Sequence, residues 1–226
     1  MFRSVLLGAA LGAAAAAHAA DARHPTVIEL YQSQGCSSCP PAIANLNALA
    51  DRPDVLTLTF AVTYWDDLGW KDTFASPAQT ARQWDYARGF GHDQVWTPQV
   101  IVDGRGDVVG ARAGQIEGLL AKTPARSGPA IDLQGRTVVI GSGAAPAGGA
   151  DVWLVRYDPR TISVAVRAGE NSGRRIDHRN VVRELVRIGR WTGSSATLPL
   201  PADAPGLKTA VLVQKTGGPI LAAVRG

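Results

Sequence analysis

Cysteine and methionine are scarce in this 226-residue chain, which has two cysteines, Cys36 and Cys39, and one methionine. Two cysteines allow a single disulfide, so a disulfide-rich secreted scaffold is excluded. The chain lacks internal repeats, and beyond its first 20 residues it has no further hydrophobic run of membrane-spanning length. The formal net charge is only +4, without basic clusters interleaved with aromatic residues. We therefore expect no nucleic-acid partner.

Residues 1–19 have the pattern of a cleaved signal peptide. Arg3 supplies a positive charge, an uncharged alanine-rich stretch follows, and residues 17–19 (Ala-His-Ala) form a small-x-small cleavage site. A membrane anchor is the alternative, but the uncharged stretch is shorter than the roughly 20 apolar residues that a bilayer requires. We predict cleavage after Ala19, no membrane span once the signal is removed, and a periplasmic or secreted protein.

The most informative stretch is residues 27–41, where a strand-like run ends in a glycine turn and Cys36-Ser-Ser-Cys39 follows. Three-residue spacing puts both sulfurs on one side of a helical turn, close enough to form and release a disulfide. A bridge that closes so short a loop gains little chain entropy, so a purely structural role is the weaker interpretation. Redox chemistry and soft-metal binding are the two functional interpretations.

Strands and helices alternate in the first half of the chain. We expect strands at 27–31 and 55–62, a short apolar strand after the Thr97-Pro98 turn, and a hairpin turn at 103–107. We expect helices at 77–90 and 115–122, and a helix through 42–50 that begins either near Cys36 or at Pro40. Residues 124–130 have the composition of a linker. After it, short β-rich runs separated by turns predict a mainly antiparallel, sandwich-like domain over 131–226.

This order of elements resembles the thioredoxin fold over residues 25–123. Two motifs carry the resemblance: the Cys36–Cys39 pair at a strand-to-helix junction, and Thr97-Pro98 before a strand. The sequences of residues 33–41 (Ser-Gln-Gly-Cys-Ser-Ser-Cys-Pro-Pro), 64–72 and 97–100 are similar to those of a bacterial exported, thioredoxin-like family, domain of unknown function 1223. The resemblance implies an α/β thioredoxin-like N-terminal domain at 24–123, separate from the β-rich domain.

The resemblance also assigns roles. Cys36 would be the more exposed, attacking thiol and Cys39 the resolving thiol, while Pro98 would be cis and lie against them. Thr97 would then present a backbone edge to an extended substrate. Thioredoxins carry a buried carboxylate six residues before the first cysteine, whereas Glu29 stands seven before Cys36. Glu29 is therefore either a proton shuttle or a partly exposed strand residue paired with an arginine.

Aromatic and imidazole side chains supply the remaining candidates. Trp65, Trp70 and Trp96 could rim the same face as the cysteines and bind apolar segments, or they could be core residues. His92, or His24, could complete a copper site with the two thiolates, because soft thiols and imidazole suit that metal. Neither histidine has metal-site spacing.

Two polar stretches are expected to be structural. We expect Asp66, Asp67, Lys71 and Asp72 to be solvated or locally paired. The stretch 169–175 has no assigned role. The arginines at 179, 183 and 187 share a helical face, although the valines around them also allow a strand. They form either a surface for an anionic partner or a solvated basic face.

Together these observations predict an exported thiol–disulfide oxidoreductase that acts through Cys36 and Cys39 on protein or small thiols, with a redox partner. The dithiol is itself the redox group, so no organic cofactor is expected. One alternative is a periplasmic copper-binding protein or metallochaperone that uses the same cysteines. A second is a non-catalytic binding protein with a structural disulfide.

Overall fold

The computed structural model describes residues 20–226, so the predicted signal peptide lies outside the described residues. The first half of the chain forms β1 (Thr26–Gln32), α1 (Cys39–Leu49), β2 (Val55–Ala61), α2 (Pro77–Phe90), β3 (Gln99–Val102), β4 (Gly106–Val109) and α3 (Ala113–Lys122). The second half forms β5 (Ile131–Gln134), β6 (Thr137–Ile140), β7 (Ala150–Asp158), β8 (Ile162–Ala165), β9 (Arg175–His178), β10 (Val181–Trp191), β11 (Ala196–Pro199), β12 (Lys208–Gln214) and β13 (Ile220–Arg225). No helix among these is long and apolar enough to cross a bilayer.

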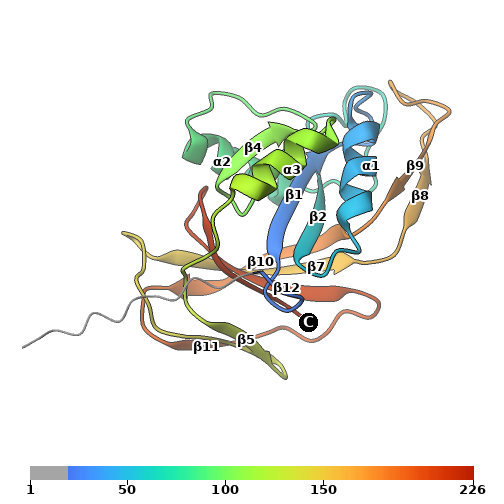
Figure 1. Ribbon diagram of the computed structural model, residues 1–226. Coiled ribbons are helices and arrows are strands. Elements are labelled where there is room, and N and C mark those ends of the chain that lie inside the picture. The colour runs from blue at the N-terminus through green and yellow to red at the C-terminus, as the bar shows by residue number, and fades with distance from the viewer. Residues whose placement is uncertain (1–19) are drawn as a thin grey trace, which may run out of the picture.

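Strands from both halves of the chain join in one mixed sheet of eight strands. Its order is β13-β12-β7-β10-β2-β1-β3-β4, so β10 of the second half lies beside β2 of the first (Figure 1). The junction is parallel and short, pairing Val181 with Thr59. The Thr59 amide donates to the Asn180 carbonyl at 3.0 Å, and the Thr59 hydroxyl donates to the Arg179 carbonyl at 2.9 Å.

The expected pair of separate domains, an α/β thioredoxin-like one and a β-rich one, is therefore wrong. Residues 20–226 are mostly β, with three helices packed on a sheet that runs through both halves. The physical reason lies in β2, whose seven residues are all buried. A fully buried strand leaves no edge open to solvent, so β2 has a strand partner on each side. One partner is β1, and the other is β10 of the second half.

The helices cover the two faces of the first-half strands. On one face, α1 and α3 pack against Ile28 and Leu30 of β1 and against the inner residues of β3 (Figure 1). On the other face, Tyr86 of α2 joins a core that continues into β7, β10, β12 and β13. Because this second core contains apolar side chains from both halves of the chain, their burial stabilises the packing of the two halves against each other.

Two smaller sheets complete the molecule. The three-stranded sheet β11-β6-β5 packs against the large sheet over Trp191, Val152 and Val213, which is the sandwich-like part of the second half. The hairpin β8–β9 leaves that sandwich and lies beside α1, where Asn47 donates to the Asp177 carbonyl at 2.7 Å. This hairpin carries the segment between β8 and β9 to the start of α1.

Candidate functional site

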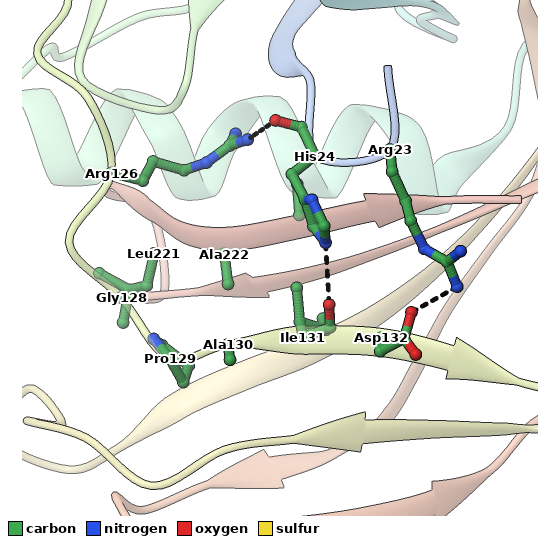
Figure 2. Close-up of a pocket in the computed structure, with 11 residues that line it drawn as sticks. Arg23, His24, Arg126, Gly128, Pro129, Ala130, Ile131, Asp132, Leu221 and Ala222 are labelled. Carbon is green, nitrogen blue, oxygen red and sulfur yellow. Dashed lines mark hydrogen bonds and ion pairs between the residues drawn. The ribbon is translucent and has the colours of Figure 1, made fainter. Parts of the chain in front are cut away.

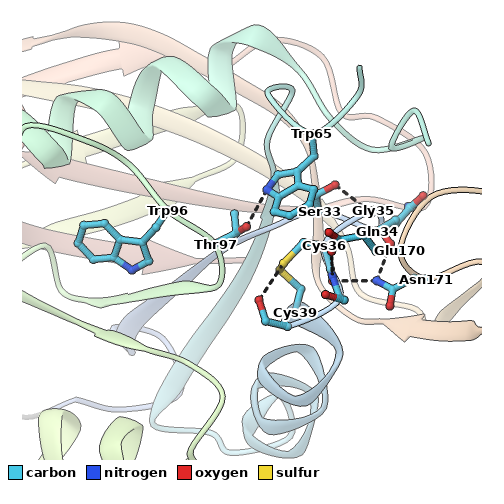
Figure 3. The surroundings of a disulfide bond; sticks show 12 residues. Ser33, Gln34, Gly35, Cys36, Cys39, Trp65, Trp96, Thr97, Glu170 and Asn171 are labelled. Atoms are coloured by element: carbon cyan, nitrogen blue, oxygen red, sulfur yellow. Dashed lines mark hydrogen bonds between the residues drawn. A yellow bond between two sulfur atoms is a disulfide. The ribbon is translucent and has the colours of Figure 1, made fainter. Parts of the chain in front are cut away.

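Cys36 and Cys39 form a disulfide where the loop after β1 enters α1, with their Cα atoms 5.4 Å apart (Figure 3). Helix α1 begins at Cys39 after Ser38, and two prolines occupy its first turn, where their missing N–H groups cost no helical hydrogen bond. The Ser38 hydroxyl lies 3.2 Å from the Cys36 sulfur. The first turn of the helix thus holds the sulfurs at its electropositive end.

Both cysteines are completely buried, with 0% of either residue exposed. This differs from the expectation that Cys36 is the more accessible thiol. The sulfurs belong to the apolar core on the α1 face of the sheet, together with Ile43, Val166 and Ile176. Val166 and Ile176 come from the β8–β9 hairpin region, so the second half of the chain closes over the disulfide.

The segment 167–173, which we name the strap, crosses the backbone of the cysteine loop (Figure 3). Asn171 is fully buried, and its side-chain NH2 donates to the carbonyls of Gln34 at 2.9 Å and Cys36 at 2.8 Å. The Glu170 carboxylate accepts from the Ser37 amide at 3.0 Å. Glycine, asparagine and serine predict a turn here, but a contact across 135 residues has no local sequence signal.

The three tryptophans of the predicted rim have different positions. Trp65 and Trp70 pack against the cysteine core and are anchored by their indole N–H groups, which donate to Thr97 Oγ1 at 2.8 Å and Gln34 Oε1 at 2.9 Å. Trp96 instead lies edge-on to the His92 ring at 5.0 Å between centroids. Two of the three are thus brought to the disulfide.

Asp72, expected to be solvated or locally paired, is a buried carboxylate. Its oxygens accept from the backbone amides of Gln34 at 2.7 Å and Phe74 at 2.8 Å, and only 3% of the residue is exposed. Burial raises its pKa to about 6, the two amide hydrogen bonds oppose that rise, and the nearby Asp66 adds to it. Asp72 therefore fixes the backbone two residues before Cys36.

The Thr97–Pro98 peptide bond is cis, as the resemblance implied. It precedes β3, whose first residue, Gln99, pairs with Val109. The next residue along the chain, Gly110, packs so closely on α1 that an added Cβ would lie 3.0 Å from the Ala42 Cβ. The end of β4, the start of β3 and the first turns of α1 therefore meet at the same end of the sheet.

Glu29 lies on the opposite face of the sheet from the disulfide. Side chains alternate along β1, so Ile28 and Leu30 face the cysteine core while Glu29 faces α2. Leu30, six residues before Cys36, occupies the cysteine-facing position, and the one-residue shift takes Glu29 to the other side.

The partners of Glu29 account for its burial. Arg82 binds its carboxylate at 2.7 Å, and the hydroxyls of Tyr31 and Tyr86 donate to it at 2.7 and 2.9 Å. Pairing with an arginine, the alternative role considered for Glu29, is confirmed, although the pair is buried rather than partly exposed. Burial, and then the negative charge of Glu29, hold the pKa values of Tyr31 and Tyr86 well above 10.

The histidines proposed as copper ligands lie elsewhere. His92 contacts Asp107 at 3.3 Å, and His24 lines a separate cavity of about 390 Å³ between the chain start, β5 and β13 (Figure 2). In that cavity the polar groups are already paired: His24 Nε2 with the Ile131 carbonyl, and Arg126 with the His24 carbonyl. Within residues 20–226, no three metal-ligating side chains come together, so the copper alternative has no third ligand there.

Comparison with known proteins identifies a family and a fold. The family described as "Protein of unknown function (DUF1223)" matches residues 27–214. The crystal structure of protein AGR_C_4864 from Agrobacterium tumefaciens is similar at 32% identity and a TM-score of 0.71, covering 88% of this chain and 92% of that one.

HBP35 of Porphyromonas gingivalis shares the fold at 11% identity and a TM-score of 0.55, over 90% of this chain and 75% of its own. The search of curated proteins found no match.

Proposed function

This chain belongs to the DUF1223 family of proteins of unknown function, and we propose from its site that it is an exported thiol–disulfide oxidoreductase acting on protein or small thiols. One observation carries the proposal: the disulfide joins Cys36, in the loop before α1, to Cys39, the first residue of α1, and closes a loop of sequence separation three. So short a loop restrains the unfolded chain little, which leaves the bond without a strong structural purpose. Its place at a helix N-terminus favours a thiolate, which is the reactive form.

The exchange has two balanced steps. A substrate thiolate attacks Cys36 Sγ, the Cys36–Cys39 bond breaks, and Cys39 leaves with the electron pair as a thiolate that takes up a proton. A second substrate thiolate then attacks the substrate sulfur of the mixed disulfide and releases Cys36. The substrate becomes a disulfide, the protein gains two electrons and two protons, and a redox partner restores the starting state. The reverse sequence reduces a substrate disulfide.

Groups around Cys36 support particular parts of this chemistry. The Ser38 hydroxyl, 3.2 Å from the sulfur, can donate a hydrogen bond to the Cys36 thiolate. Thr97 and the tryptophans anchored at 65 and 70 supply polar and aromatic surface beside it. Glu29 has no part in the proposal because it faces the other side of the sheet.

A second candidate is a non-catalytic binding protein in which the disulfide is structural. The complete burial of Cys36 and Cys39 favours it, since catalytic cysteines are usually accessible.

Trapping of a mixed disulfide separates the two candidates. The reduced Cys39→Ser variant should form a stable adduct through Cys36 with a peptide disulfide, while Cys36→Ser should form far less. The wild type should release the adduct, because Cys39 resolves it. If none of the three folded proteins exchanges, and both substitutions only lower the melting temperature, the structural candidate holds.

A further inference from the structure

The disulfide is closed off from solvent, and the strap, residues 167–173, lies on the backbone of the loop that carries it. Thiol–disulfide exchange requires a nucleophile to reach a sulfur along the S–S axis, and both cysteines are 0% exposed. The strap spans the backbone of residues 34–37 through the Asn171 and Glu170 contacts. If the disulfide reacts, as the proposed function requires, a part of this cover has to move first.

A single buried side chain anchors the strap. Asn171 is buried, whereas the other six residues of the segment are exposed. Its NH2 group makes both hydrogen bonds to the cysteine loop, but its Oδ1 is buried without a hydrogen-bond partner. When Asn171 lifts, Oδ1 regains water, which offsets part of the two hydrogen bonds lost. The anchor is therefore specific in geometry and weak in net free energy.

Two glycines of the strap have backbone conformations that allow it to turn, while the strands below it stay paired. Gly169 and Gly173 have positive φ angles of 69° and 82°, a region that glycine enters without a steric penalty. Below them the β8–β9 ladder continues, with Ala165 paired to Arg175. Gly169 also packs tightly on the next loop, where an added Cβ would lie 3.2 Å from the Trp70 Cβ.

We propose that the strap is a gate over the Cys36–Cys39 disulfide, and that Asn171 is the positioning residue that holds it closed. The inference rests on the proposed function and adds its regulation: access of the substrate is limited by release of the Gln34 and Cys36 carbonyls. The gate also selects substrates, because a partner that binds the exposed strap can open it, while a free thiol has to wait for spontaneous opening.

Reduction kinetics test the gate. The disulfide of the full mature protein is reduced with increasing dithiothreitol, and the rate is followed by trapping free thiols. The wild-type rate should level off at high dithiothreitol, because opening becomes limiting. Asn171→Ala should be about tenfold faster and remain proportional to concentration, since it has lost both hydrogen bonds. Ser172→Ala is the matched control: its hydroxyl bonds only to Arg167 within the strap, so its rates should equal the wild type.

Two further variants and one equilibrium measurement test whether the strap limits access to the disulfide. Glu170→Gln changes an exposed residue, so it should fold normally and give a smaller acceleration. Asn171→Asp keeps the shape but sets a carboxylate against two carbonyls, and should be at least as fast as Asn171→Ala. The reduction potential should change little in all of them, because a gate alters access rather than equilibrium. A changed potential with an unchanged rate would overturn the gate.

The two possible failures are distinguishable. If the wild type is reduced in simple proportion to dithiothreitol, and the strap variants match it, the gate is refuted while the oxidoreductase proposal stands. If wild type and strap variants all stay folded and resist high dithiothreitol, the oxidoreductase proposal itself fails.

Discussion

His178 offers a sharp test of how the β8–β9 hairpin is held. The residue lies at the end of β9 with 0% exposed, neither ring nitrogen has a hydrogen-bond partner, and the ring packs edge-on to Phe74 at 5.4 Å between centroids. Burial lowers the pKa of His178 from 6.5 to about 4, against the opposing charge of Asp177. The folded protein therefore keeps this imidazole neutral.

The sign and size of the effect on stability follow from this shift. Above pH 6.5 the imidazole is neutral in both states, so it costs nothing. As the pH falls from 6.5 towards 4, the unfolded chain takes up a proton that the folded chain refuses, and stability is lost. At about 1.4 kcal/mol per pKa unit, the full loss is about 3.5 kcal/mol and is complete below pH 4.

The His178→Leu variant isolates this term, because leucine fills a similar volume, cannot be protonated, and gives up no hydrogen bond. Urea unfolding of the oxidised proteins at pH 7.5, 6.5, 5.5 and 4.5 measures the difference from wild type. Between pH 7.5 and pH 4.5 the unfolding free energy of the variant should rise by about 2.5 kcal/mol relative to that of the wild type. Ile176→Val in the same strand changes no titratable group, so its difference should be constant. A constant difference for His178→Leu as well would refute the reasoning.

Unfolding free energies check three other predictions. Glu29→Gln leaves the Arg82 guanidinium buried without its partner and should cost about 3–5 kcal/mol; a cost below 1 kcal/mol would contradict the buried pair. The raised pKa of Asp72 means that ionising this carboxylate destabilises the folded state. As the pH rises from 3.8 to above 6, the unfolding free energy of Asp72→Asn should therefore rise by about 3 kcal/mol relative to that of the wild type. Gly89→Ala should lower the unfolding free energy by about 1–3 kcal/mol or more, because its Cβ would lie 1.7 Å from the Gly217 carbonyl oxygen. Gly118→Ala in α3 has open space around it and should raise the unfolding free energy by about 0.5–1 kcal/mol.

Local patterns predicted the elements well. The helix at 77–90 is observed as Pro77–Phe90, because Ser76 caps its start by accepting from Gln79 and Gly91 ends it in a left-handed conformation. The short β-rich runs expected in the second half are observed as strands, since alternating apolar residues and turn residues are local signals. The single sheet that contains strands of both halves was not predicted. It depends on one parallel pair, Val181 with Thr59, between residues far apart in sequence.

The candidate site shows the same division. The cysteine spacing was enough to predict a disulfide at the start of a helix, and this is observed. The burial of Asp72 and the contacts of Asn171 with the cysteine loop depend on loops whose paths are fixed by tertiary packing. The sequence therefore predicted a solvated or locally paired Asp72 and no role for Asn171. Glu29 shows how one residue of spacing matters: a buried carboxylate in β1 was correctly suspected, but strand alternation puts it on the α2 face.

The reduction potential of the Cys36–Cys39 pair tests the central claim most directly. It is measured by equilibrating the full mature protein with defined glutathione or dithiothreitol ratios until the Asn171→Ala variant and the wild type agree, so that slow opening does not distort the result. An oxidoreductase should give a value between about −270 and −120 mV, the range of known thiol–disulfide exchange proteins. A value below about −300 mV, typical of structural disulfides, would contradict the account.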